Sequence, residues 1–224
     1  MLAPLPVHLW PDDAVQAIAE LRSPAGLTVI GVPTPAAASR AEARQAIRHA
    51  LQRTLAAFLR QPVLDVTLLS SPGQQVRVLA AGTPVRVAIS HMPGLSVAAI
   101  STRAAVGVDV MAVGVQSFPD WARLAHDYLG PLAAKALQHA PLVDRPAALA
   151  QAWTALEARL KCLGMGLMEW TPELAALLSV CDVASLALPA GICGAVAIAQ
   201  AAALAKPPSR RFGFYSTVRS KRLG

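Results

Sequence analysis

Three residues in the second half of the chain, Trp153, Glu157 and Lys161, recur at intervals of four. In a stretch rich in alanine and leucine this spacing places all three on one face of a helix. Trp153 would anchor that face, while a carboxylate and an ammonium group point into the same site. A Glu–Lys pair at this spacing alone is more often an ordinary surface pair, worth a few tenths of a kcal/mol, so its chemistry depends on what else lies nearby.

Asp109 stands in an otherwise apolar run, residues 106–115. A carboxylate in such a run pays a heavy desolvation cost unless it meets a metal or another partner. One acid on a strand and one on a helix is a common way to hold Mg²⁺ beside a phosphate, because this ion keeps several of its waters. The sequence therefore predicts that Asp109 and Glu157 share a site.

Candidate phosphate contacts lie in the first half of the chain. His91, which follows Ser90 at the end of an apolar run, could form a hydrogen bond to a phosphate, although a lone histidine at such a place is more often structural. A row of arginines follows near-helical spacing, and a solvated helix face is the more common meaning of such a row. The row consists of Arg40, Arg44, Arg48 and Arg53.

The order of the predicted helices and strands indicates an α+β fold in two halves. In the first half we expect strands at residues 27–32, 63–69, 75–79, 85–90 and 95–101, and a helix from Ser39 to about Leu59. In the second half we expect strands at residues 107–113, 175–183 and 192–199, and a long helix at residues 146–163. The predicted units are residues 1–104, residues 105–205 and a basic tail at residues 206–224.

Several common motifs are absent from the sequence. It contains no G-x-x-x-x-G-K-[ST] loop, no G-x-G-x-x-G after a strand and no G-x-S-x-G elbow. It also lacks zinc-ligand spacing and a basic surface interleaved with aromatic residues, so we expect no nucleic-acid partner.

An ordered set of motifs resembles the Sfp-type 4′-phosphopantetheinyl transferases. These are Ser90-His91, then Gly107-Val108-Asp109, then the helix from Trp153 to Lys161 followed by Gly164-Met165-Gly166-Leu167. The resemblance runs from about residue 40 to residue 200. It implies two similar α+β halves, related by a pseudo-twofold axis, with coenzyme A bound as co-substrate in the cleft between them.

The resemblance also implies roles for single residues. Asp109 and Glu157 would bind Mg²⁺, and Glu157 would take the proton of the acceptor serine on an acyl or peptidyl carrier protein. Lys161 would offset charge on the phosphates during transfer, which releases 3′,5′-ADP. The residues implied for the phosphates of coenzyme A are Ser90, His91, Arg44 and Arg48.

Three positions depart from the family pattern. Thr83 replaces a lysine in a Gly-Lys-Pro turn, Leu156 replaces the lysine before the catalytic glutamate, and Met111 replaces a second strand acid. Each lost lysine removes a charge-assisted contact worth about 1.5–3 kcal/mol. The alternative to an active enzyme is therefore a family member that binds coenzyme A or a carrier protein without catalysing transfer.

The remaining composition bears on location and partners. Nearly all of the net charge of +7 comes from the tail, because residues 206–224 hold six of the 20 basic residues and none of the 13 acids. Residues 183–205 carry no charge, but Pro189, Gly191 and Gly194 interrupt them, which favours a buried strand over a transmembrane helix. The N-terminus does not read as a signal peptide, and the three cysteines lack metal spacing. We expect a cytoplasmic monomer with free thiols and no membrane insertion. A basic tail of this kind is more often a solvated, flexible end, and docking of an acidic carrier protein by the tail or by the arginine helix is the alternative.

Overall fold

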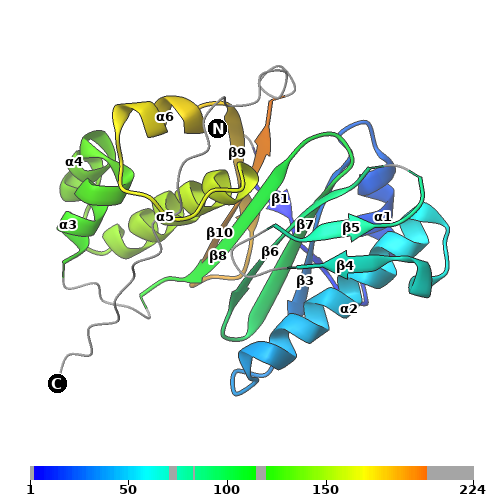
Figure 1. The fold of residues 1–224 in the computed structure, drawn as a ribbon. Coiled ribbons are helices and arrows are strands. Elements are labelled where there is room, and N and C mark those ends of the chain that lie inside the picture. The colour runs from blue at the N-terminus through cyan, green and yellow to red at the C-terminus, as the bar shows by residue number, and fades with distance from the viewer. Residues whose placement is uncertain (1–2, 71–74, 83, 115–119, 201–224) are drawn as a thin grey trace.

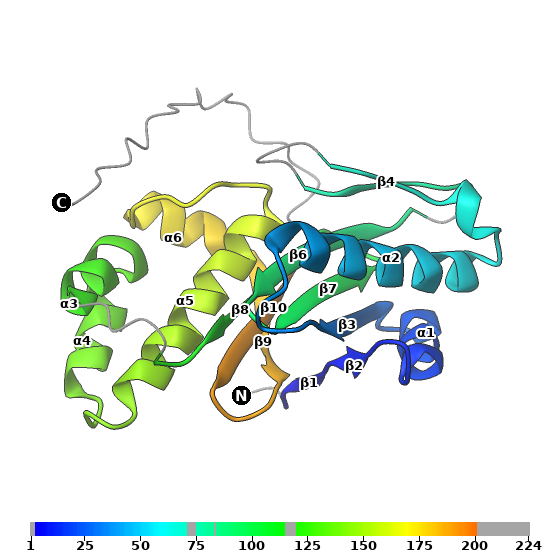
Figure 2. The same ribbon diagram turned by 90° about the horizontal axis from the view of Figure 1, so that it is seen from below.

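The chain folds into two β-sheets with helices on their outer sides (Figure 1). The computed structural model describes residues 3–70, 75–82, 84–114 and 120–200. Helix α2 (Arg40–Leu59) packs over one sheet and helix α5 (Arg145–Cys162) over the other, with strands of both sheets between them (Figures 1 and 2). The predicted α+β class is confirmed.

The larger sheet belongs to the first half of the chain. Its strand order is β2 (His8–Leu9), β3 (Leu27–Pro33), β7 (Leu95–Ser101), β6 (Arg86–Met92), β5 (Arg77–Leu79) and β4 (Thr67–Leu69). Helix α1 (Ala14–Arg22) and a 3₁₀ turn, η1 (Val63–Asp65), complete this half. Helix α2 begins at a capping box in which Ser39 and Glu42 exchange hydrogen bonds, and it buries Ile47, Leu51 and Leu55 completely.

The smaller sheet has the order β1 (Leu5–Pro6), β9 (Cys181–Ala187), β10 (Ile192–Ala199) and β8 (Val106–Ala112). Besides α5, this half contains α3 (Trp121–Leu124), the π-helical turn η2 (Ala125–Leu129), α4 (Pro131–His139) and α6 (Pro172–Leu178). Strand β1 was assigned to the first half by the sequence, yet it pairs with β9 in the second.

Both halves share one order of elements. In each half, a strand is followed along the chain by a long helix and later by a β-hairpin. The second strand of that hairpin pairs with the first strand of the half, so the spatial order is β3-β7-β6 in the larger sheet and β8-β10-β9 in the smaller sheet. This common order is compatible with a pseudo-twofold relation, which stays a prediction. The two sheets bury one apolar core between them, in which Val97 and Ala99 of β7 meet Val108 of β8 and Val196 of β10.

Two expected strands are wrong in part. Residues 175–183 form the end of helix α6 and only the start of β9, because Thr171 caps the helix by accepting a hydrogen bond from the Leu174 amide at 3.1 Å. Residues 63–69 begin with the turn η1 before β4 starts. Three features of the sequence lie outside the described residues. They are the Ser-Pro-Gly turn expected at residues 71–73, between the strands predicted at 63–69 and 75–79, then Thr83, and the tail at residues 206–224.

The uncharged segment at residues 183–205 contributes to β9 and β10, and the strand predicted at residues 192–199 is confirmed. Within the described residues, no helix is both long and apolar enough to cross a membrane.

The close approach of α5 to β8 depends on Gly107. A Cβ atom at this position would overlap the Ala158 carbonyl oxygen and the Cys162 amide nitrogen of α5. We predict that Gly107→Ala lowers the free energy of unfolding by about 1–3 kcal/mol, because backbone atoms of α5 must move to admit the methyl group.

Urea denaturation measures this change. Gly166→Ala is the matched control, since a Cβ at Gly166 meets nothing within 4 Å, and it should change the unfolding free energy by less than about 0.5 kcal/mol. Equal stability of the two variants would contradict the close packing of α5 on β8.

Candidate active site

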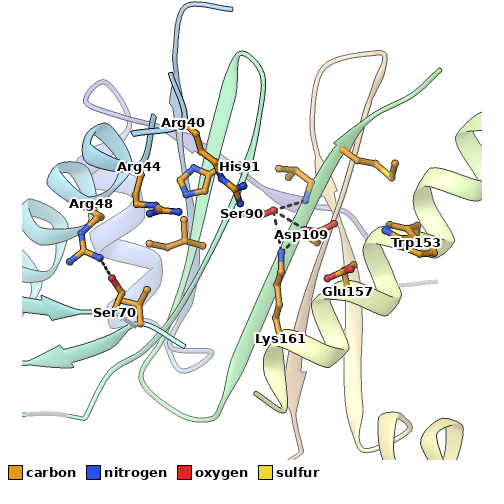
Figure 3. A pocket seen from close by; sticks show the side chains of 14 residues that line it. Arg40, Arg44, Arg48, Ser70, Ser90, His91, Asp109, Trp153, Glu157 and Lys161 are labelled. Carbon is orange, nitrogen blue, oxygen red and sulfur yellow. Dashed lines mark hydrogen bonds and ion pairs between the residues drawn. The ribbon is translucent and has the colours of Figure 1, made fainter. Parts of the chain in front are cut away.

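A cavity of about 700 Å³ opens between helices α2 and α5 (Figure 3). Arginines of α2 form one wall, residues of α5 form the opposite wall, and the ends of β6 and β8 lie between them. The lining residues are Arg40, Arg44, Arg48, Ser70, Val76, Ile89, Ser90, His91, Asp109, Val110, Met111, Trp153, Glu157 and Lys161. The seven residues to which the resemblance assigned roles are all among them.

Asp109 is the centre of a hydrogen-bonded cluster that joins three elements. Its Oδ1 atom accepts a 2.6 Å hydrogen bond from Nζ of Lys161 and a 2.7 Å hydrogen bond from the hydroxyl of Ser90. The ammonium group also lies 3.4 Å from Ser90 Oγ. Asp109 is only 8% exposed, so these partners offset the cost of burying its charge.

Glu157 lies one helical turn before Lys161 on the same wall of the cavity. Burial raises the pKa of its carboxyl group, and the negative charge of Asp109 raises it further, while Lys161 lowers it. Because two carboxylates share one cavity, Glu157 holds a proton more readily than an exposed glutamate does. A raised pKa brings a carboxylate closer to the range suited to general base catalysis near neutral pH.

His91 lies on the α2 side of the cavity. Its Nδ1 atom is 2.8 Å from the hydroxyl of buried Ser96. Burial lowers the pKa of the imidazole, and the positive charges of Arg44, Arg40 and Lys161 lower it further. A neutral imidazole surrounded by cations becomes easier to protonate when a phosphate enters, because the anion offsets their repulsion.

The arginine wall comes from one face of α2. Arg40, Arg44 and Arg48 follow each other at intervals of four, and all three line the cavity. Arg48 is held in place by hydrogen bonds to the Ser70 hydroxyl, at 3.0 Å, and to the Leu68 carbonyl. Arg53, the fourth member of the row, does not line the cavity.

Residues 105–194 match the 4′-phosphopantetheinyl transferase superfamily. This match contains Asp109, Glu157 and Lys161, and it confirms the predicted resemblance at the level of the superfamily and over these residues. No curated protein matches the chain. The match covers β8, α5, β9 and the start of β10, so it supports a transferase of this superfamily through the half that supplies the acids.

The donor set agrees with a Mg²⁺ ion. This ion is usually held by one or two carboxylates together with waters and substrate phosphates, and the cavity offers Asp109 and Glu157. The Oδ2 atom of Asp109 accepts no hydrogen bond from the described residues, which leaves it open to a ligand. Those residues include no group of three or more His, Cys, Asp or Glu side chains that could hold a metal ion, so a bound ion would depend on substrate oxygens and water.

Leu156, which replaces a lysine of the family pattern, does not leave a gap in the cavity wall. Its side chain is 7% exposed and packs with Leu160, Leu174 and Leu178 between α5 and α6. The sequence interpretation placed a missing charge at the phosphate site, but in this structure Leu156 lies outside the lining of the cavity. A helix turns by about 100° per residue, which directs residue 156 away from the wall that carries Glu157.

The structure also shows where Met111 and Ser90 lie. Met111 lines the cavity on the same strand as Asp109, at the position where a second acid was expected. Ser90 was assigned to a phosphate, yet its hydroxyl is buried and donates to Asp109. Thr83 is outside the described residues.

Three further residues contribute to the site although the resemblance assigned them no role there. Arg40 belongs to the arginine row described above, and its spacing of four residues from Arg44 is the sequence signal that places it on the same helix face. Trp153 lines the cavity and packs edge-on against Tyr128, with ring centroids 5.7 Å apart. Gln75 donates to the carbonyls of Lys161 and Cys162, the latter at 3.3 Å, and no sequence signal indicated this long-range contact.

The raised pKa of Glu157 predicts a pH-dependent stability difference. The folded state holds the Glu157 proton to higher pH than the unfolded state, so the ionised carboxylate destabilises the fold above the raised pKa and has no such effect below the ordinary value. In metal-free buffer, Glu157→Gln should therefore raise the free energy of unfolding at about pH 8 by less than about 1 kcal/mol, since the group is half-exposed.

Urea denaturation at about pH 8 and about pH 4 tests this window. The difference between Glu157→Gln and the wild type should vanish at the acidic pH. Glu169→Gln, a change at an exposed glutamate, provides the control. A Glu157→Gln variant that is less stable than the wild type at about pH 8 would show that the carboxylate is stabilised rather than repelled in its cavity.

Proposed function

We propose that the protein transfers the 4′-phosphopantetheine group of coenzyme A to a serine of an acyl or peptidyl carrier protein, with Mg²⁺ as cofactor. The main observation in support is that a cationic wall and a wall with a carboxylate and an ammonium group face each other across one cavity. Three arginines stand on α2, and the pair Glu157 and Lys161 stands on α5 beside Asp109. The match at residues 105–194 adds independent support.

Coenzyme A carries a diphosphate and a separate 3′-phosphate, and the cavity provides cations on both of its walls. Arg40, Arg44 and His91 are available to one phosphate group from the α2 side. Lys161 is available to another from the α5 side and stands against Asp109. A ligand with phosphates at two places can therefore meet positive charge at each end.

Proton transfer is assigned to Glu157. In this proposal the carboxylate accepts the proton of the acceptor serine while the serine oxygen forms a bond to the β-phosphorus of coenzyme A. The bond between that phosphorus and the bridging oxygen breaks, and 3′,5′-ADP leaves with the electron pair. The serine then carries phosphopantetheine through a phosphodiester linkage.

The remaining residues orient the reacting groups. When bound, Mg²⁺ would supply charge neutralisation at the phosphates, held by Asp109 and Glu157. Ser90 fixes the Asp109 carboxylate through its 2.7 Å hydrogen bond. Catalysis of this kind consists mainly of positioning and electrostatic stabilisation.

We further propose that the protein acts as a monomer in the cytoplasm. Both walls of the cavity come from one chain, so the site does not require a second copy. The three cysteines are free thiols, as a reducing compartment requires.

Intact mass spectrometry of apo carrier protein tests the reaction. Incubation with the protein, coenzyme A and Mg²⁺ should add the mass of one phosphopantetheine. Glu157→Gln should slow the addition by about 100-fold or more, because a positioned general base contributes about 10²–10⁴-fold. Glu169→Gln should leave the rate unchanged.

Two outcomes would redirect the proposal. Absence of product with several carrier proteins, in a sample that binds coenzyme A, would identify a non-catalytic member of the superfamily. Full activity of Glu157→Gln would remove Glu157 from the proton-transfer step.

The arginine wall generates a separate prediction. Arg44→Ala should raise the KM for coenzyme A by roughly tenfold or more, because a charge-assisted hydrogen bond contributes about 1.5–3 kcal/mol. The KM for the carrier protein should change little. Arg53→Ala is the matched control, since it removes an arginine of the same helix from outside the cavity. Equal KM values for the two variants would exclude a phosphate contact at Arg44.

A further inference from the structure

In the outer part of the larger sheet, one face is exposed and no helix within the described residues covers it. Val76, Val78 and Ala80 pack into the core beneath α2. Because side chains alternate along a strand, Arg77 and Leu79 of β5 face away from that core, and both are exposed. Leu69 of β4 and Leu79 are 44% and 45% exposed, respectively. We call Leu69, Arg77, Leu79 and Arg86 the hairpin face.

The register of the strands places like charges side by side on the hairpin face. Leu69 pairs with Arg77, and Arg77 pairs with Arg86 of β6. Two cations directly opposite each other on neighbouring strands destabilise a sheet. Neither arginine forms an ion pair within the described residues. The parts of the sequence beyond them contain no aspartate or glutamate, so this chain supplies no acidic side chain to separate the two charges.

The hairpin face borders the active-site cavity. Arg86 and Ser90 are on the same side of β6, by alternation through Ala88. Just before β5, Gln75 donates to the carbonyls of Lys161 and Cys162 at the end of α5. Ser70 and Val76, next to the ends of β4 and β5, line the cavity itself. A protein seated on this face would thus lie beside the catalytic residues.

We propose that the hairpin face is the docking surface for the protein that carries the acceptor serine, and that this partner presents an acidic surface with apolar side chains. This inference rests on the proposed function. Acidic groups would pair with Arg77 and Arg86, while apolar groups would cover Leu69 and Leu79. The combination of exposed leucines with an unneutralised arginine pair fits a protein surface, where an apolar patch is rimmed by charge.

The arginine pair is distinct from the site assigned to coenzyme A. Arg77 and Arg86 do not line the cavity, whereas Arg40, Arg44 and Arg48 do. The hairpin face should therefore govern affinity for the acceptor protein and leave affinity for coenzyme A unchanged.

The test measures binding of fluorescently labelled apo acyl carrier protein by anisotropy, without coenzyme A. The double variant Arg77→Glu/Arg86→Glu should weaken binding by roughly tenfold or more and flatten its dependence on salt. The control Arg53→Glu/Arg103→Glu makes the same change in net charge at two exposed arginines elsewhere. Thermal unfolding of both variants checks that each is folded.

A second variant, Leu69→Ser/Leu79→Ser, tests the apolar part of the surface. It should also weaken binding of the carrier protein, with unchanged affinity for coenzyme A. Equal binding by the wild type and both hairpin-face variants would overturn the proposal. An effect of Arg77→Glu/Arg86→Glu that disappears when residues 201–224 are deleted would overturn it as well, because the substitutions would then act through the basic tail and not through the hairpin face.

The two proposals fail separately. If wild-type protein transfers phosphopantetheine and Arg77→Glu/Arg86→Glu leaves the KM for the carrier protein unchanged, the docking surface is wrong and the function stands. If no transfer occurs but the hairpin-face variants lose binding to the carrier protein, the docking surface stands and the catalytic proposal is wrong.

Discussion

The ion pair between Asp109 and Lys161 fixes the geometry on which the site depends. Its 2.6 Å contact ties the last turn of α5 to the middle of β8, and the 2.7 Å hydrogen bond from Ser90 ties both to β6. These three residues come from both halves of the chain. A buried carboxylate without such partners would be unstable, so the cluster couples the position of α5 to the junction between the two sheets.

This cluster determines the charge state of the groups around it. Lys161 stabilises the Asp109 carboxylate, and the resulting negative charge, together with burial, raises the pKa of Glu157. On the opposite wall, burial lowers the pKa of His91, and the positive charges of Arg44 and Arg40 lower it further. Glu157 and His91 therefore both favour their neutral forms more than they would on an exposed surface, and an entering polyanion favours protonation of His91.

Local sequence patterns predicted the parts of the structure that depend on neighbouring residues. The i, i+4 spacing placed Glu157 and Lys161 on one helix face, and the apolar run around Asp109 correctly indicated a buried acid with a partner. Contacts between distant segments were not predictable in this way. The pairing of β1 with β9 and the contact of Gln75 with the end of α5 depend on how the two halves pack.

Leu156 shows that a residue next to a catalytic one in the sequence need not face the site. A residue adjacent to Glu157 in the sequence is turned by about 100° around the helix, and here it fills the space against α6. Its neighbour in the same cluster, Leu160, is one turn further along the same buried face. The helix therefore separates an apolar face that holds α6 in place from a polar face that lines the cavity.

The apolar side chain of Met111 influences the charge balance of the cavity, because it stands where an acid would add a negative charge. Four cationic and two acidic side chains line the cavity, which leaves a net positive site when His91 is neutral. An acid at position 111 would stand two residues from Asp109 on the same face of β8. It would compete for Lys161 and raise the pKa of Glu157 further. The thioether avoids both effects, so the cavity retains a stronger attraction for a polyphosphate while the Asp109–Lys161 pair stays intact.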